Sequence, residues 1–231
     1  MMKNTELVRK LIEIAMNYKT LYVRGCIGAP LTAYNKKRYT NNNAYNRNPI
    51  RQAMINAASE DTFGFDCSCL IKSVLWGWSG DTSAVYGGTK YASNGVPDIS
   101  ADAMINKCSD ISKDFSDIMP GEAVWIQGHI GIYIGDGFAV ECTPKWANRV
   151  QITSCNCKRE GFNRRNWTKH GKLPYVEYPE PIIHTVVKGD TLWGIARKYL
   201  GRGSRYMEIV EYNHLAKPAI FVGDKLKIPN E

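Results

Sequence analysis

The sequence has 231 residues, of which 44% are hydrophobic and 23% are charged. This composition is typical of a folded globular protein and argues against a disordered chain. No apolar run reaches the roughly 20 residues that a membrane-spanning helix needs. The net charge of +8 indicates polyanionic surroundings, which could be nucleic acid, anionic lipid or a cell wall that carries teichoic acid. The cationic residues are scattered, and short clusters such as Arg164-Arg165 are expected on a solvated face.

The length allows one medium domain and one small module, because domains usually contain about 100 to 200 residues. The first 20 residues place Leu7, Leu11 and Ile14 at helical spacing among charged residues. We therefore expect an amphipathic helix there and not a secretory signal peptide. If the protein acts outside the membrane, another system must release it from the cytoplasm.

Seven cysteines, an odd number, argue against a complete disulfide framework and suggest free thiols. The pairs Cys67/Cys69 and Cys155/Cys157 are too closely spaced for typical zinc ligands. We therefore expect neither a metal nor an organic cofactor.

One cysteine stands at the start of a predicted helix. Apolar residues recur at helical spacing over 70–75, and Asp66 is a plausible N-cap, so Cys67 would lie in the first turn. There the free amides and the helix dipole favour a thiolate, and the Cys67 amide could stabilise an oxyanion. A buried structural cysteine is the alternative interpretation.

Two of the four histidines, His129 and His170, lie outside the C-terminal region and are candidates for a base that activates this thiol. His170 stands in a polar stretch and is expected at the surface or in a turn. His129 begins a strand, 129–135, whose even positions are all isoleucine. One face of that strand belongs to the core, and the other face can line a cleft.

The hairpin that follows decides which residue meets His129. A two-residue loop at 136–137 would put Glu141 on the isoleucine face, where its carboxylate would be buried without a partner. A three-residue loop at 135–137, with Gly137 left-handed in a bulge, puts Glu141 opposite Gly131 and within reach of His129. We therefore expect a His129–Glu141 pair. The accompanying strand pairs are Ile134 with Phe138, Ile132 with Val140, and Ile130 with Cys142.

These motifs resemble the NlpC/P60 family of papain-like cell-wall cysteine peptidases. The family's Asp-Cys-Ser-Gly-Leu motif is similar to residues 66–70, and its histidine strand is similar to residues 129–135. Residues 120–125 fit the preceding strand, and residues 22–25 resemble a segment whose tyrosine lines the site. The resemblance implies an α+β papain-like domain over residues 1–176. It assigns Cys67 as the nucleophile, His129 as the base, Glu141 as the residue that orients the base, and Tyr22 as a residue that polarises the carbonyl.

The sequence also departs from the family pattern. Cys26 and Cys69 stand where the family usually has glycine. They are either small residues that fit or thiols that oxidise with Cys67 and silence it. The polar, aromatic segment 32–48 is interpreted as a substrate-facing insertion similar to those of phage endolysins, and residues 79–118 as a second variable lobe.

The C-terminal residues have a different pattern. Prolines mark an extended linker at 177–183. Residues 184–231 then predict a strand at 184–187, a helix from Leu192 with Asp190 or Thr191 as N-cap, a second helix near 206–210 and a closing strand at 225–229. This βααβ order resembles the LysM module, which implies binding of glycans that contain N-acetylglucosamine. The resemblance places the binding groove at Gly189, Asp190, Thr191, Leu192, Ala219 and Ile220.

Together these resemblances imply a peptidoglycan hydrolase that cleaves a stem-peptide amide through a thioester. The favoured bond is the D-glutamyl–diamino acid linkage, and the muramoyl–L-alanine amide is the alternative. A catalytically inactive wall-binding protein is the rival from another class, whereas no motif for reading nucleic acid accompanies the charge. We expect a monomeric phage or prophage lysin, made in the cytoplasm and acting on the cell wall.

Overall fold

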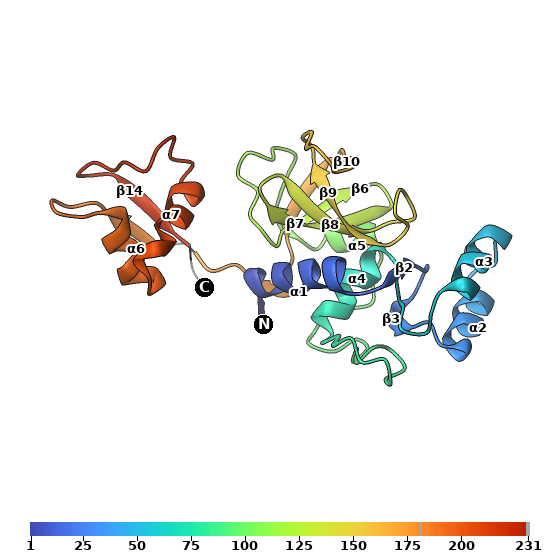
Figure 1. Ribbon diagram of the computed structural model, residues 1–231. Coiled ribbons are helices and arrows are strands. Elements are labelled where there is room, and N and C mark those ends of the chain that lie inside the picture. The colour runs from blue at the N-terminus through green and yellow to red at the C-terminus, as the bar shows by residue number, and fades with distance from the viewer. Residues whose placement is uncertain (181, 230–231) are drawn as a thin grey trace. The chain divides into compact units, whose positions relative to one another are not determined.

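The computed structural model describes residues 1–180 and 182–229, and it divides into two compact units, with the second beginning at Tyr178 (Figure 1). Pro181 of the predicted linker, and Asn230 and Glu231 of the predicted C-terminal module, lie outside the described residues. Within the described residues, no helix is long and apolar enough to cross a bilayer.

A seven-stranded sheet organises the N-terminal unit. Its strand order is β10-β9-β8-β7-β6-β11-β5, and all neighbouring strands are antiparallel except β9 and β10. The unit is therefore α+β, as predicted. The strands are β5 Ser109–Ser112, β6 Ala123–Ile126, β7 His129–Gly135, β8 Phe138–Cys142, β9 Val150–Cys155, β10 Arg164–Arg165 and β11 Lys169–Lys172.

Two helices pack beside each other against this sheet: α1 (Asn4–Asn17) and α4 (Cys67–Leu75). Helix α1 buries Leu7, Leu11 and Ile14, so the predicted amphipathic helix is confirmed. Every residue of α4 is buried, and the helix packs on β7 and β8. A short helix, α5 (Ala101–Ile105), packs on β6 and β7. The helix that carries Cys67 thus lies against the strand that begins with His129.

A second, three-stranded sheet leads into helix α4. It consists of β2 (Thr20–Tyr22), β4 (Phe63–Phe65) and β3 (Ile27–Pro30), with β4 in the centre. The chain between β3 and β4 forms α2 (Ala33–Asn42) and α3 (Pro49–Ala57), which lie side by side (Figure 1). The polar insertion is therefore helical. A short parallel pair, β1 (Met2–Lys3) and β12 (Val176–Glu177), joins the two ends of the unit.

The β7–β8 hairpin differs from the predicted three-residue loop. Gly135 pairs with Phe138, so the turn contains two residues, Asp136 and Gly137. Both have a positive φ, +50° and +76°. The left-handed Gly137 is as predicted, but the extra residue is Ile134, which forms a bulge in β7. This bulge has the same effect on register as a longer loop, since one residue is added to one strand.

The expected pairing of Ile132 with Val140 is confirmed, whereas the expected pairing of Ile134 with Phe138 is wrong. Among the described residues the β7–β8 ladder ends at Ile132 and Val140, so the expected Ile130–Cys142 pair is not part of it. The alternating register nevertheless brings Glu141 to the side of the strand on which His129 lies.

The C-terminal unit has the predicted βααβ order. Strand β13 (Ile182–Thr185) pairs with β14 (Lys225–Ile228), and helices α6 (Leu192–Leu200) and α7 (Tyr206–Tyr212) lie between them in the chain. A 3-10 turn, Gly203–Arg205, precedes α7. The first strand begins and ends two residues earlier than predicted. The unit has its own core, formed by Val186, Leu192, Ile195, Ala196, Leu200, Ile209, Val210, Leu226 and Ile228.

Candidate active site

Cys67 is the first residue of helix α4, and Asp66 is the N-cap, as predicted. The Asp66 carboxylate accepts a hydrogen bond from the Cys69 amide (2.7 Å) and a second from the Gly25 amide (2.8 Å). The first bond satisfies an amide that has no acceptor within the helix. The second joins the start of α4 to the segment after β2, so Asp66 places Cys67 beside the Tyr22–Gly25 segment.

The Cys67 thiol is buried, and its chemistry differs from the expectation of a thiolate favoured by the helix start. Burial and the negative charge of Asp66 raise the pKa of Cys67 to about 12, although hydrogen bonds from backbone amides, including Ile130, lower it. The predicted direction was wrong because the sequence shows the helix start but not the depth of burial. The Ile130 contact places the sulfur next to the residue that follows His129.

Tyr22 lies close to this thiol. Its side chain and Cys67 line the same cavity, and the pKa of Tyr22 is raised by burial and then by the charge that Cys67 would carry. The cavity has a volume of about 870 Å³. It is also lined by Gly128, which precedes His129. The charged residues that line it include Arg24, Arg38, Asp66, Lys72, Asp98 and Asp102, which come from separate segments of the chain.

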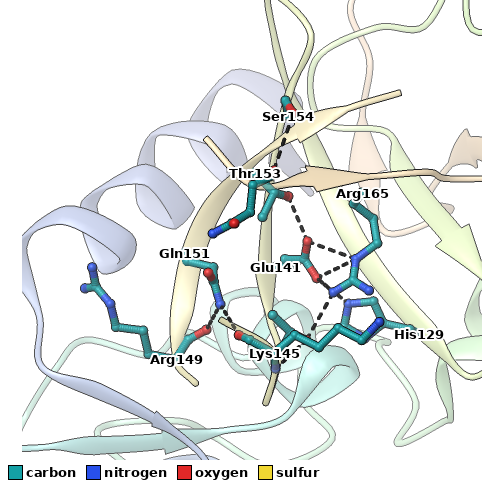
Figure 2. Close-up of polar contacts among 10 residues, drawn as sticks. His129, Glu141, Lys145, Arg149, Gln151, Thr153, Ser154 and Arg165 are labelled. Atoms are coloured by element: carbon teal, nitrogen blue, oxygen red, sulfur yellow. Dashed lines mark hydrogen bonds and ion pairs between the residues drawn. The ribbon is translucent and has the colours of Figure 1, made fainter. Parts of the chain in front are cut away.

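His129 is paired with Glu141, as the hairpin argument predicted. His129 Nε2 lies 2.6 Å from Glu141 Oε2, and the side chains are 13% and 0% exposed. Figure 2 shows the two residues pointing toward each other from adjacent strands. This contact occupies Nε2 and leaves Nδ1 for another partner. Among the described residues no hydrogen bond joins the His129 ring to the Cys67 sulfur.

Three further residues surround the pair, and the sequence argument missed all of them. Arg165, from β10, donates to both oxygens of Glu141, and Thr153, from β9, donates to Oε1 at 2.7 Å (Figure 2). The ring of Trp167 is stacked on His129 at an interplanar angle of 7° and a centroid distance of 5.5 Å. Arg165 is buried, so its predicted place on a solvated face was wrong.

Only one of these three had a signal in the sequence. Glu141 pairs with Gln151 across β8 and β9, so alternation puts Thr153 on the Glu141 side of the sheet. Arg165 lies in a two-residue strand, which is too short for periodicity. Trp167 reaches β7 because Gly131 has no side chain: a Cβ there would lie 3.1 Å from the tryptophan ring.

Burial raises the pKa of Glu141, but hydrogen bonds from His129 and Arg165, together with their charges, outweigh it, so the net pKa is lowered. A buried carboxylate without such partners would take up a proton. The site can therefore keep an ionised, fixed acceptor behind His129. This arrangement suits a histidine that receives a proton at its other nitrogen.

The remaining cysteines are free thiols. Burial raises the pKa of Cys26 to about 12 and raises that of Cys69 well above its usual value. Both are buried beside the start of α4, which agrees with small residues that fit there.

The described residues contain no cluster of three His, Cys, Asp or Glu side chains that could hold a metal ion.

His170, expected at the surface or in a turn, is a buried residue of β11. Its Nδ1 contacts the Glu122 carboxylate, and its Nε2 contacts the Asp114 carbonyl oxygen at 2.6 Å. The expectation was wrong because the polar stretch forms an interior strand of the sheet, with β6 and β5 on its two sides. His170 belongs to a structural pair that is distinct from the His129 site.

The residues proposed for glycan binding lie on two loops of the C-terminal unit. Thr191 is the N-cap of α6, and Asp190 accepts hydrogen bonds from His184 Nε2 and the Val187 amide, both at 2.8 Å. Leu192 packs in the core, as does the half-buried Ile220. Gly189 is exposed and Ala219 is half-buried. The two loops are joined where Val186 donates to the Asp224 carbonyl and accepts from the Gly223 amide, each at 2.8 Å.

Within the C-terminal unit, residues 184–229 match the model of the LysM domain family. These residues form a LysM domain. Two curated relatives, each named "Probable N-acetylmuramidase", come from Lactococcus lactis subsp. cremoris and subsp. lactis. Each is 48% identical over 46 residues, which is 20% of this chain and only 10% of the relative's length.

The chain is also similar to solved structures. The P60 domain of an antigen from M. avium subspecies paratuberculosis is 19% identical, with a TM-score of 0.40, and the match covers 76% of this chain and 96% of that one. NlpC2 from Trichomonas vaginalis is 12% identical, with a TM-score of 0.37, covering 74% of this chain and 46% of that one.

Proposed function

We propose that this protein is a peptidoglycan hydrolase that cleaves an amide of the stem peptide with Cys67 as nucleophile. The observation that carries the proposal is the convergence of the four side chains that the sequence analysis singled out. Cys67 and Tyr22 line one cavity, Cys67 contacts the Ile130 amide, and the adjacent His129 is bonded to Glu141. This is the thiol, base and orienting group that nucleophilic amide cleavage needs.

The proposed reaction starts from a neutral thiol, in keeping with the raised pKa of Cys67. The sulfur attacks the carbonyl carbon while its proton passes to His129 Nδ1. The Cys67 amide and the Tyr22 hydroxyl stabilise the oxyanion. Collapse breaks the C–N bond, and the departing amine takes the proton from His129, leaving a thioester. Water, deprotonated by His129, hydrolyses the thioester and restores the thiol.

The cavity supports a peptide substrate with charged groups. Its lining includes the cationic Arg24 and Arg38 and the anionic Asp98 and Asp102. A stem peptide carries both carboxylates and amines, so such a cavity has partners for each. The LysM domain supports the polymer: we propose that it binds N-acetylglucosamine-containing glycan through the loops at 189–192 and 219–220 and so concentrates the enzyme on the wall.

We propose the D-glutamyl–diamino acid amide as the bond that is cut, because the motif resemblance favours it. The alternative is the muramoyl–L-alanine amide. Purified peptidoglycan should be digested with the full chain and the products identified by mass spectrometry. Muropeptides that keep L-Ala-D-Glu on muramic acid would support the endopeptidase, whereas free muramic acid carboxyl groups would support the amidase.

A catalytically inactive wall-binding protein is a second candidate, because the pKa of Cys67 is high and its sulfur has no hydrogen bond to His129 in the described structure. Turbidity assays on cell walls separate the two functions. Under our proposal the wild type solubilises walls, and Cys67→Ala and His129→Ala bind walls without solubilising them. A wild type that binds walls and releases nothing would identify the inactive binder. Full activity in Cys67→Ala would remove the nucleophile assignment.

A further inference from the structure

We infer that Arg165 is a positioning residue for catalysis, which fixes the Glu141 carboxylate in the orientation and charge state that His129 requires. The inference rests on the proposed function, because it assigns a role within the same site. Arg165 is buried and its side chain donates to Glu141 and Thr143, so it would act through Glu141 and not on the substrate.

The contacts leave the Glu141 carboxylate a single orientation. Arg165 Nη2 donates to Oε2 at 2.6 Å, and Arg165 Nε lies 3.2 Å from Oε1 and 3.1 Å from Oε2. Thr153 donates to Oε1, and Arg165 Nη2 also donates to Thr143 Oγ1 at 3.1 Å. A planar guanidinium that contacts both oxygens fixes the plane of the carboxylate. Oε2 is thereby held 2.6 Å from His129 Nε2.

Burial makes the charge of Arg165 necessary. Glu141 is fully buried and Arg165 is 7% exposed, so neither charge is stabilised by bulk water. A carboxylate in this position without a permanent cation would be protonated at a higher pH. A protonated Glu141 would be a weaker acceptor for His129, and the imidazolium formed during the reaction would lose its counter-charge.

Aromatic rings hold the guanidinium and the imidazole in the same assembly. The Arg165 guanidinium carbon lies 4.7 Å from the centroid of Trp146 and 5.7 Å from that of Trp167. Trp167 is the ring on which His129 is stacked. Arg165 and His129 therefore share one buried neighbour, and a shift of either side chain would disturb the other.

The other titratable groups near the pair cannot replace Arg165. Helix α4 contributes Cys67, β8 contributes Cys142 and β9 contributes Cys155, all thiols whose pKa is raised. Helix α5 contributes Asp102, whose carboxylate accepts from the Gly128 amide and from Trp125 Nε1, each at 2.8 Å. Among the described residues, Arg165 is the permanent cation bonded to Glu141.

The test uses the full chain with Arg165→Met, Arg165→Lys and the matched control Arg164→Gln, whose side chain is exposed on the same strand. Initial rates on soluble muropeptides give kcat and KM as a function of pH. Carbon-13 NMR of glutamate-labelled protein, assigned with Glu141→Gln, follows the Glu141 carboxyl without reference to activity.

We expect Arg165→Met to lower kcat about 10-fold or more while KM changes little, because substrate binding is intact and only the base is misplaced. The acid limb of its kcat–pH profile should move to higher pH, and the pKa of Glu141 measured by NMR should rise by about one unit or more. Arg165→Lys should restore the pKa of Glu141 and part of kcat, since lysine returns the positive charge but not the planar guanidinium. Arg164→Gln should match the wild type.

If Arg165→Met does not fold, Arg165→Lys and the double variant Glu141→Gln/Arg165→Met, which removes both buried charges, carry the test. Under our inference the double variant folds and is no less active than Glu141→Gln alone, because Arg165 acts only through Glu141. A further loss in the double variant, or an unshifted pH profile and Glu141 titration in Arg165→Met, would overturn the inference. If the wild type is inactive but the pKa of Glu141 still rises in Arg165→Met, the proposed function is wrong and the effect of Arg165 on Glu141 stands.

Discussion

Asp66 and Gly25 are joined by a hydrogen bond of 2.8 Å between the carboxylate Oδ2 and the backbone amide. The other carboxylate oxygen caps helix α4 at the Cys69 amide. One side chain thus fixes both the thiol and the segment that follows Tyr22. The same carboxylate has a cost, because its negative charge is the second cause, after burial, of the raised pKa of Cys67.

We predict that Asp66→Asn increases the reactivity of Cys67 toward iodoacetamide at pH 8. Asparagine keeps a capping oxygen but removes the charge, so the pKa of the thiol should fall and a larger fraction should be thiolate. Alkylation rates measured by mass spectrometry across pH would test this. Asp66→Ala is the companion variant. It also removes the charge, but its free energy of unfolding should be lower by about 1 kcal/mol because the helix cap is lost. Equal alkylation rates for Asp66→Asn and wild type would contradict the prediction.

Arg51 connects the helical insertion to Tyr22. It is 9% exposed, and its guanidinium donates to the Tyr22 carbonyl and to Asn148 Oδ1 (the latter at 2.6 Å) while lying 5.5 Å from the Tyr22 ring centroid. Helix α3 therefore holds the strand end from which the Tyr22 side chain enters the cavity. This gives the insertion a structural role beside the cavity contacts that Arg38 and Tyr39 make.

We predict that Arg51→Met lowers both stability and kcat. Hydrogen bonds to a charged group contribute about 1.5 to 3 kcal/mol, so the free energy of unfolding in urea should fall by an amount in that range. The kcat on muropeptides should fall because Tyr22 is no longer fixed beside Cys67. Lys37→Met, at an exposed position of α2, is the matched control and should change neither quantity. An active, destabilised Arg51→Met would show that the insertion does not position Tyr22.

The sequence predicted the elements of the site better than their chemistry. Periodicity and the Asp66 cap identified α4, and alternation in β7 and β8 identified the His129–Glu141 contact. The bulge at Ile134 could not be predicted, because a longer turn and a bulge have the same effect on register. Arg165 had no signal, since tertiary folding alone brings it to Glu141. For the same reason the sequence indicated a thiolate at Cys67, where burial favours the thiol.

Glu141 should make the stability of the protein depend on pH. Its pKa in the folded state lies below the ordinary 4.5, against the opposing effect of burial, because His129 and Arg165 bind the ionised form. A lowered folded pKa stabilises the protein above the unfolded value, and this stabilisation is lost as the pH falls through the folded pKa.

We predict that Glu141→Gln lowers the free energy of unfolding by about 3 to 5 kcal/mol at pH 7, because it leaves Arg165 buried without an ionised partner. The difference from wild type should narrow as the pH falls below 4.5, because the Glu141 carboxyl of the unfolded wild type then takes up a proton while that of the folded protein stays ionised. Urea unfolding of both proteins from pH 7 to pH 3 measures it. A difference that stays constant over this range would show that folding does not lower the pKa of Glu141.

The LysM domain offers a test that is independent of Cys67. The Val186 hydrogen bonds to Gly223 and Asp224 hold the loop that contains Gly189 beside the loop that contains Ala219. We predict that Ala219→Arg, made in the full chain with Cys67→Ala to prevent wall digestion, weakens binding to N-acetylglucosamine oligomers about 10-fold or more. A long charged side chain between the loops would occupy the proposed groove, and a loss of 1.4 kcal/mol in binding is a factor of ten.

Isothermal titration with chitin oligosaccharides measures the affinity, and thermal unfolding checks that the domain is intact, since Ala219 lies outside the core formed around Leu192. Lys225→Gln, at an exposed position of β14, is the control and should bind as the parent does. If Ala219→Arg binds with undiminished affinity, the groove lies elsewhere on the LysM domain. The exposed Trp193 on α6 would then be the next side chain to replace, because aromatic faces commonly pack against sugar rings through their apolar surface.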